Sequence, residues 1–203
     1  MQKGYIKRNY NPSLKINAIP AKYYIALNGI KFLRTQPVCQ KAYLLKLYKE
    51  HKKSPSFIDQ CLLIADIYLH LLETEPNINF YTQSDFSPRG IIKELSPDFG
   101  FTRTVEGKKT NYVAEFFSEI IPSKAISATI TKHLDFFTER DITSSPMILF
   151  ICPSQSMAKV VLRLSNEMLE ANEGEDLTIL ISTQEQVKQQ GIEKDIWTQA
   201  IAS

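Results

Sequence analysis

Two short apolar runs constrain the fold of this chain more than any other feature of its sequence. They are MILFIC (147–152), which follows Pro146, and LTILIS (177–182). Uninterrupted apolar runs of this length are typical of strands that are buried on both faces of a sheet. One helical pattern, over about 157–171, separates the runs, and another, over about 122–140, precedes them. This alternation predicts an α/β layer whose sheet is at least partly parallel.

The segment before this layer predicts further strands. INFYTQ (78–83) is strand-like, and SPDFGFTRT (96–104) and NYVAEFF (111–117) form a hairpin pattern around Gly107. Two more strands are predicted near the start of the chain, at GYIKRNY (4–10) and KYYIAL (22–27). The second of these ends at Asn28-Gly29, which is a turn signal.

Helical spacing predicts which side of each helix is buried. Pro37 opens a helix with an apolar face made of Val38, Ala42, Leu45 and Tyr48. Ser56 caps a second helix, whose apolar face is made of Phe57, Cys61, Ile64, Ala65, Tyr68 and Leu72. In the helix over 122–140 the stripe is Ile126, Ile130, Leu134 and Phe137, which leaves His133 on the outward, solvated side.

Charge is distributed very unevenly along the 203 residues. Residues 1–53 hold 12 Lys or Arg and one acid, Glu50, a net charge of +11. Residues 54–203 hold 12 basic and 21 acidic residues, a net charge of −9. A strongly basic end that is interleaved with tyrosines suggests contacts with a polyanion such as DNA. The alternative is a solvated basic face with no partner.

The sequence predicts a cytoplasmic protein. No apolar run approaches the ~20 residues of a membrane-spanning helix, and the first residues lack the apolar core of a signal peptide. Cys39, Cys61 and Cys152 are odd in number, far apart and set in apolar contexts, so we expect buried free thiols and no structural zinc.

Two carboxylates are candidates for a metal site. Asp98 follows Pro97, and Glu115 stands in the apolar run YVAEFF. If the two segments pair as a hairpin, the carboxylates approach each other at one sheet edge, where they could hold Mg²⁺. The metal would activate water and stabilise charge on a phosphodiester. In the alternative, the carboxylates have no chemistry and are held by hydrogen bonds or by Arg103, Lys124 or Lys132.

These residues carry a resemblance. Pro97-Asp98, the hairpin, Glu115, a helix and MILFICPS resemble the PD-(D/E)XK nuclease-like core, and more narrowly the replication-relaxation family of plasmid and conjugative-element proteins. That family joins a winged helix-turn-helix to such a core. The resemblance implies a wing-like hairpin over 1–36, linking helices over 37–76 and the core over 77–203. The recognition helix would lie upstream, so we expect a natural short form or a fragment.

The resemblance also implies a departure from nuclease chemistry. Nucleases of this type carry a Lys two residues after the Glu, where this sequence has Phe117. Lys132 or Lys124, on the following helix, could replace that Lys, which makes Asp98, Glu115 and Lys132 the catalytic set of an active enzyme. We expect instead a protein without cleavage activity and without a cofactor, with Mg²⁺ bound only if the carboxylate site is active.

The expected function is DNA binding by an accessory or regulatory protein of a plasmid or mobile element, in replication, relaxation or conjugative transfer. The expected phosphate contacts are Lys3, Lys7, Arg8, Lys15 and Lys22. Other relaxation or transfer proteins are candidate partners, and a homodimer is one option. A metal-dependent DNA endonuclease and a protein-interaction scaffold remain the alternatives.

Overall fold

The computed structural model describes residues 3–9, 20–39, 41–50, 53–86, 95–105, 107–138, 146–171, 177–192 and 194–202. Contacts divide the chain into two compact units, residues 1–59 and 60–203. The boundary falls within one helix, α4 (Pro55–Thr74).

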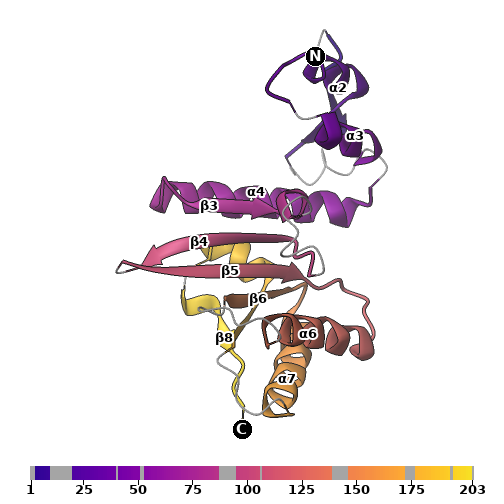
Figure 1. The fold of residues 1–203 in the computed structure, drawn as a ribbon. Helices are drawn as coiled ribbons and strands as arrows, with labels where there is room; N and C mark the ends of the chain where they lie inside the picture. The colour runs from indigo at the N-terminus through magenta and orange to yellow at the C-terminus, as the bar shows by residue number, and fades with distance from the viewer. Residues whose placement is uncertain are drawn as a thin grey trace. The chain divides into compact units, whose positions relative to one another are not determined.

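The larger unit is built on a six-stranded mixed sheet (Figure 1). The strands follow the order of the chain across the sheet, from the outer strand β3 to the outer strand β8. Strands β3, β4 and β5 are antiparallel, β5, β6 and β7 are parallel, and β8 is antiparallel to β7. Their bounds are β3 Asn79–Thr82, β4 Phe99–Val105, β5 Lys108–Phe116, β6 Met147–Cys152, β7 Thr178–Thr183 and β8 Thr198–Gln199. The predicted α/β layer with a partly parallel sheet is confirmed.

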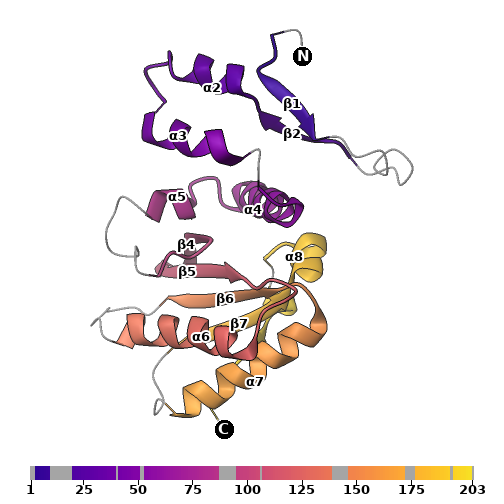
Figure 2. The same cartoon turned by 90° about the vertical axis from the view of Figure 1, so that its right-hand side faces the viewer.

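Helices cover both faces of this sheet. The connections from β5 to β6 and from β6 to β7 carry α6 (Ser123–Thr138) and α7 (Gln155–Ala171). Both helices pack on one face, because right-handed connections between successive parallel strands lie on the same side (Figure 2). On the other face lie the buried side chains of α4, α8 (Gln184–Gln190) and the 3-10 turn Lys194–Ile196.

Strand β6 is the centre of the core. Ile148, Leu149, Phe150 and Ile151 are fully buried, with successive side chains contributing to opposite faces of the sheet. The apolar run MILFIC is therefore a strand that is buried on both faces, as predicted.

The smaller unit pairs a hairpin with two helices. The predicted strands are present as β1 (Ile6–Asn9) and β2 (Lys22–Ile25), which pair antiparallel. Helix α2 (Leu27–Leu33) follows directly, and α3 (Lys41–Glu50) comes next.

The prediction of a turn at Asn28-Gly29 is wrong, because both residues lie inside α2. Gly29 is buried at a close approach between this helix and the chain before β1. A Cβ atom at position 29 would lie 2.4 Å from the carbonyl oxygen of Tyr5. The glycine is therefore needed for packing and not for a turn.

Two predicted helix faces are also wrong. Pro37 and Val38 lie in turns after α2, where Val38 is 89% exposed, and α3 begins only at Lys41 and buries Leu44. In α4 the buried side chains are Leu63, Ile67 and Leu71, which lie beside the predicted stripe. Helix α4 is apolar around most of its circumference, so its sequence alone does not single out the buried face.

The start of α4 is fixed by Ser54 and not by Ser56. The Ser54 hydroxyl oxygen accepts a hydrogen bond of 3.2 Å from the backbone N–H of Phe57. Pro55 takes the first helical position, where its missing N–H costs no hydrogen bond.

Candidate functional site

Asp98 stands immediately before β4 and links β5 to Gln83, the residue that follows β3. Its backbone N–H donates to the carbonyl of Ala114 at 3.0 Å, and its carbonyl accepts from the N–H of Gln83 at 3.0 Å. Its carboxylate Oδ2 accepts from the N–H of Phe116 at 2.8 Å. The side chain thus continues the β4–β5 ladder by one hydrogen bond beyond the last strand pair. The side-chain amide of Gln60, on α4, also donates to Oδ2, at 3.4 Å.

The environment of Asp98 favours the protonated form of its carboxyl group. Burial raises the pKa of Asp98 to about 6 and outweighs the Phe116 hydrogen bond, which lowers it. The nearby charge of Glu115 raises the pKa further. The group is therefore half protonated near pH 6 and mostly ionised at neutral pH.

Glu115 is held by a histidine on the helix that covers its strand. Glu115 lies on β5, one residue after Ala114, and Ala114 pairs with Phe99, the residue that follows Asp98. Oε2 of Glu115 lies 2.5 Å from Nε2 of His133, on α6. The ring of His133 is fully buried, and its Nδ1 has no hydrogen-bond partner among the described residues.

The prediction of a solvated His133 is therefore wrong. Position 133 is seven residues after Ile126 and four before Phe137, so it lies on the same helical face as those two buried residues. The ring packs edge-on against Phe150 of β6, with centroids 5.4 Å apart. The imidazole fills a place in the core and supplies Glu115 with a partner.

Of the two carboxylates predicted as a pair, Asp98 stands just before β4 and Glu115 lies on the neighbouring strand β5, and different groups bind them. The cations expected beside them are engaged elsewhere or exposed. Lys132 donates to the carbonyl of Leu95 at 2.7 Å, Arg103 pairs with Glu75, and Lys124 is exposed.

The described residues around Asp98 and Glu115 do not have the features of a metal-binding site. Phe117, at the position of the nuclease lysine, is buried against Phe150 at a centroid distance of 5.2 Å. Within the described ranges, no three His, Cys, Asp or Glu side chains gather closely enough to hold a metal ion. Asp98 and Glu115 supply carboxylate oxygens of the kind that ligate Mg²⁺.

The basic residues predicted to contact DNA lie on two sides of the hairpin. Residues that face each other across an antiparallel pair share one face. Lys7 stands opposite Tyr24 on one face, and Arg8 stands opposite Tyr23 on the other. Each face of the hairpin therefore presents a cation beside a tyrosine.

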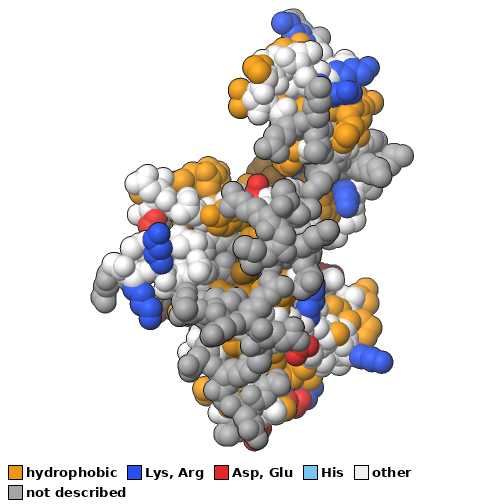
Figure 3. Space-filling model, viewed as in Figure 1, with side chains coloured by type: hydrophobic (Ala, Val, Ile, Leu, Met, Phe, Trp, Pro, Cys, Tyr) orange, Lys and Arg blue, Asp and Glu red, His pale blue; other side chains and the backbone are white. Residues whose placement is uncertain are grey.

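The remaining predicted contacts differ in their surroundings. Lys3 is exposed, whereas Lys22 forms an ion pair with Asp59 within the same unit. Lys15 lies outside the described residues. Figure 3 shows Lys and Arg side chains next to hydrophobic ones over the small unit.

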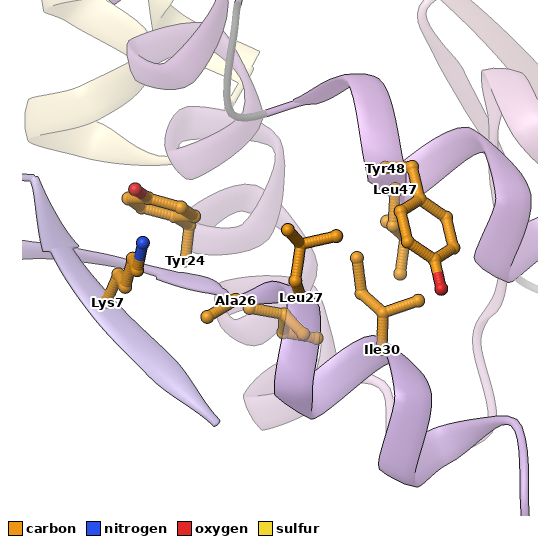
Figure 4. Close-up of a pocket in the computed structure, with 8 residues that line it drawn as sticks. Lys7, Tyr24, Ala26, Leu27, Ile30, Leu47 and Tyr48 are labelled. Carbon is orange, nitrogen blue, oxygen red and sulfur yellow. The ribbon is translucent and has the colours of Figure 1, made fainter. Parts of the chain in front are cut away.

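The Lys7 face of the hairpin borders a small cavity of about 90 Å³ (Figure 4). Lys7 and Tyr24 lie side by side at one end of it. Apolar side chains from α2 and α3 form the rest of the wall, among them Leu27, Ile30 and Leu47. The cavity is too small for a nucleotide, and we assign it no ligand.

The three cysteines are in different environments. Cys152 is fully buried, which raises the pKa of its thiol to about 12 and makes a reactive thiolate unfavourable. Cys39 is half-buried and Cys61 is exposed on α4, so the expectation that all three are buried is wrong. All three are free of disulfides, as expected.

The chain matches no protein-family model, and no curated protein matches it significantly. The structure defines a mixed α/β protein with a six-stranded sheet between helices and a separate two-stranded hairpin. Of the helices in the described ranges, only α4 has the length and apolar composition of a membrane span, a test that a long core helix also passes.

Proposed function

We propose that the protein binds DNA through its basic N-terminal unit and does not cleave it. The observation that carries the proposal is the pairing of Lys7 with Tyr24 and of Arg8 with Tyr23 on a hairpin, within a segment of net charge +11. Cations on an extended hairpin suit contacts with phosphates, and tyrosines suit sugars and bases.

The biological role that we propose is that of an accessory or regulatory protein of a plasmid or mobile element. This part of the proposal rests on the resemblance to the replication-relaxation family. The order of elements supports it, since α4 is followed by three antiparallel strands, with the short helix α5 (Gln83–Phe86) after the first, and then by a helix and a buried parallel strand. Asp98 just before β4 and Glu115 near the end of β5 also support it, because the resemblance rests on a Pro-Asp, a hairpin and a Glu in this order.

The absence of cleavage is proposed because the carboxylates are already engaged. Oδ2 of Asp98 accepts from Phe116, and Oε2 of Glu115 lies against His133. The buried Phe117 leaves no cation two residues after Glu115 to polarise an attacking water.

Charge reversal on the hairpin tests DNA binding. We expect Lys7→Glu with Arg8→Glu to weaken binding to a labelled duplex by roughly tenfold or more at low salt, and to reduce the slope of log K against log[salt] by about 2. The control is Lys159→Glu with Lys188→Glu, which makes the same change in net charge on exposed positions of the larger unit. Equal losses in both double variants would overturn a hairpin-specific site.

A metal-dependent endonuclease is the second candidate, because Asp98, just before β4, is close enough to Glu115 on β5 for the charge of Glu115 to raise its pKa. It would use Mg²⁺ at the carboxylates and Lys132 as the cation. It predicts Mg²⁺-dependent nicking of a supercoiled plasmid that is lost in Asp98→Ala. DNA binding without cleavage predicts no nicking, and unchanged DNA binding in Asp98→Ala.

A homodimer is also part of the proposal. Leu62 and Leu69 of α4 are exposed apolar side chains on a helix that buries Leu63 and Ile67. Sedimentation of the full chain with and without Leu69→Lys tests this assembly. Dimerisation that is lost in the variant supports it, and a monomer at all concentrations contradicts it.

A further inference from the structure

One face of the β1–β2 hairpin is both apolar and cationic, and we call it the outer hairpin face. It consists of Ile6, Arg8, Tyr23 and Ile25, which share a side because Ile6 stands opposite Ile25 and Arg8 stands opposite Tyr23. Tyr23 is 56% exposed, Ile6 49% and Ile25 42%. Exposed apolar side chains that form a contiguous patch can mark a binding surface, whereas single scattered ones do not.

We propose that the outer hairpin face binds the unpaired bases of single-stranded nucleic acid. The inference rests on the proposed DNA-binding function and specifies that the ligand is single-stranded and not duplex. Bases without a pairing partner expose flat apolar faces that stack on tyrosine, and their phosphates pair with arginine.

The composition of the face favours a single strand over a duplex. A duplex presents phosphates and groove edges, and it hides the faces of its bases by stacking. Tyr23 lies opposite Arg8, and the Ile6–Ile25 pair is next to it on the same face. The apolar part of this face gains little from phosphates, whereas it buries apolar area against an unstacked base. Tyr24, on the opposite face, is half-buried against the cavity and is less open to a ligand.

Charge argues against a second copy of the chain as the occupant. The face carries Arg8 and belongs to a segment of net charge +11, so self-association would bring like charges together. A polyanion neutralises the same charges and releases counterions.

The experiment compares a labelled single strand of about 20 nucleotides with the corresponding duplex by fluorescence anisotropy, using the full chain. We expect the single strand to bind at least roughly tenfold more tightly. Tyr23→Ala should weaken single-strand binding by roughly tenfold, because loss of one stacked base costs about that factor. Tyr23→Phe, which keeps the ring, should bind like the wild type.

The matched control is Tyr43→Ala, which removes an equally exposed tyrosine of the same unit from α3 and not from the hairpin. Circular dichroism shows whether each variant is folded. An effect of Tyr23→Ala that Tyr43→Ala does not share supports the inference.

The remaining outcomes overturn it in distinguishable ways. Equal or tighter binding of the duplex, unaffected by Tyr23→Ala, contradicts the single-strand site and leaves the proposed DNA binding in place. No binding of either form at low salt contradicts both. A dimer that Tyr23→Ala dissociates, without single-strand binding, assigns the face to a second copy and also overturns the inference.

Discussion

Nε2 of His133 lies 2.5 Å from Oε2 of Glu115, and the imidazole is fully buried between α6 and the sheet. The contact joins β5 to the helix that follows it in the chain. A carboxylate in an apolar strand thereby receives a hydrogen-bonding partner from within the core, which offsets part of the cost of its burial.

The first prediction concerns the stability of this contact. His133→Ala should lower the free energy of unfolding by about 2–4 kcal/mol, because it opens a cavity beside Phe150 and leaves Glu115 without its partner. Urea denaturation measures the change. Asp135→Ala, at an exposed position of the same helix, is the control and should change stability by less than about 0.5 kcal/mol. A loss below about 1 kcal/mol in His133→Ala would contradict the structural role described here.

The second prediction concerns pH. The pKa of Asp98 is raised to about 6 in the folded protein from 3.8, so the folded state holds its proton more tightly than the unfolded state does. The contribution of Asp98 to stability is therefore fully present below about pH 4 and is lost as the pH rises through about 6.

Asp98→Asn removes this dependence and keeps an oxygen that can accept from Phe116. We expect the variant to exceed the wild type by about 1–2 kcal/mol in free energy of unfolding at pH 8, with the difference vanishing near pH 4. Urea denaturation at pH 4, 6 and 8 checks both values. A difference that is the same at all three pH values would show that ionisation of Asp98 is not its cause.

The third prediction concerns Gly29. A methyl group at this position meets the carbonyl oxygen of Tyr5, which is backbone and yields little. Gly29→Ala should destabilise the N-terminal unit by about 1–3 kcal/mol. Amide hydrogen exchange should show faster exchange in β1, β2 and α2 with little change in β6. Asn28→Ala, at the neighbouring exposed position, should leave exchange in all of these elements almost unchanged.

The fourth prediction concerns the thiols. Cys61 is exposed and should react quickly with a disulfide reagent, whereas the buried Cys152, with its raised pKa, should react only after unfolding. Cys61→Ser should remove one thiol from the labelling that precedes unfolding and leave the half-buried Cys39 as the other reactive group. An unchanged number of thiols labelled before unfolding in Cys61→Ser would contradict this assignment.

The elements of the larger unit were predictable where one pattern dominates. The run MILFIC is apolar at every position, and the stripe of Ile126, Ile130 and Leu134 has a clear helical period, so both were correctly predicted as buried. The hairpin that brings Asp98 near Glu115 could also be predicted from the sequence, because Gly107 marks its turn. In the structure this glycine has a positive φ of 79°.

Other features depend on packing that no local pattern encodes. The partner of Glu115 was missed because His133 is polar, although its spacing from Ile126 places it on the core face. The buried side of α4 was missed because apolar residues surround that helix. Gly29 was wrongly predicted to lie in a turn, because glycine is favoured both in turns and where a helix packs closely against another segment of backbone.

The outer strands of the sheet are its shortest, with four residues in β3 and two in β8, while the four inner strands have six to nine. Unsatisfied backbone amides and carbonyls along a sheet margin are templates for intermolecular pairing and aggregation. Short outer strands expose few such groups, so this protein should resist edge-to-edge polymerisation even at high concentration.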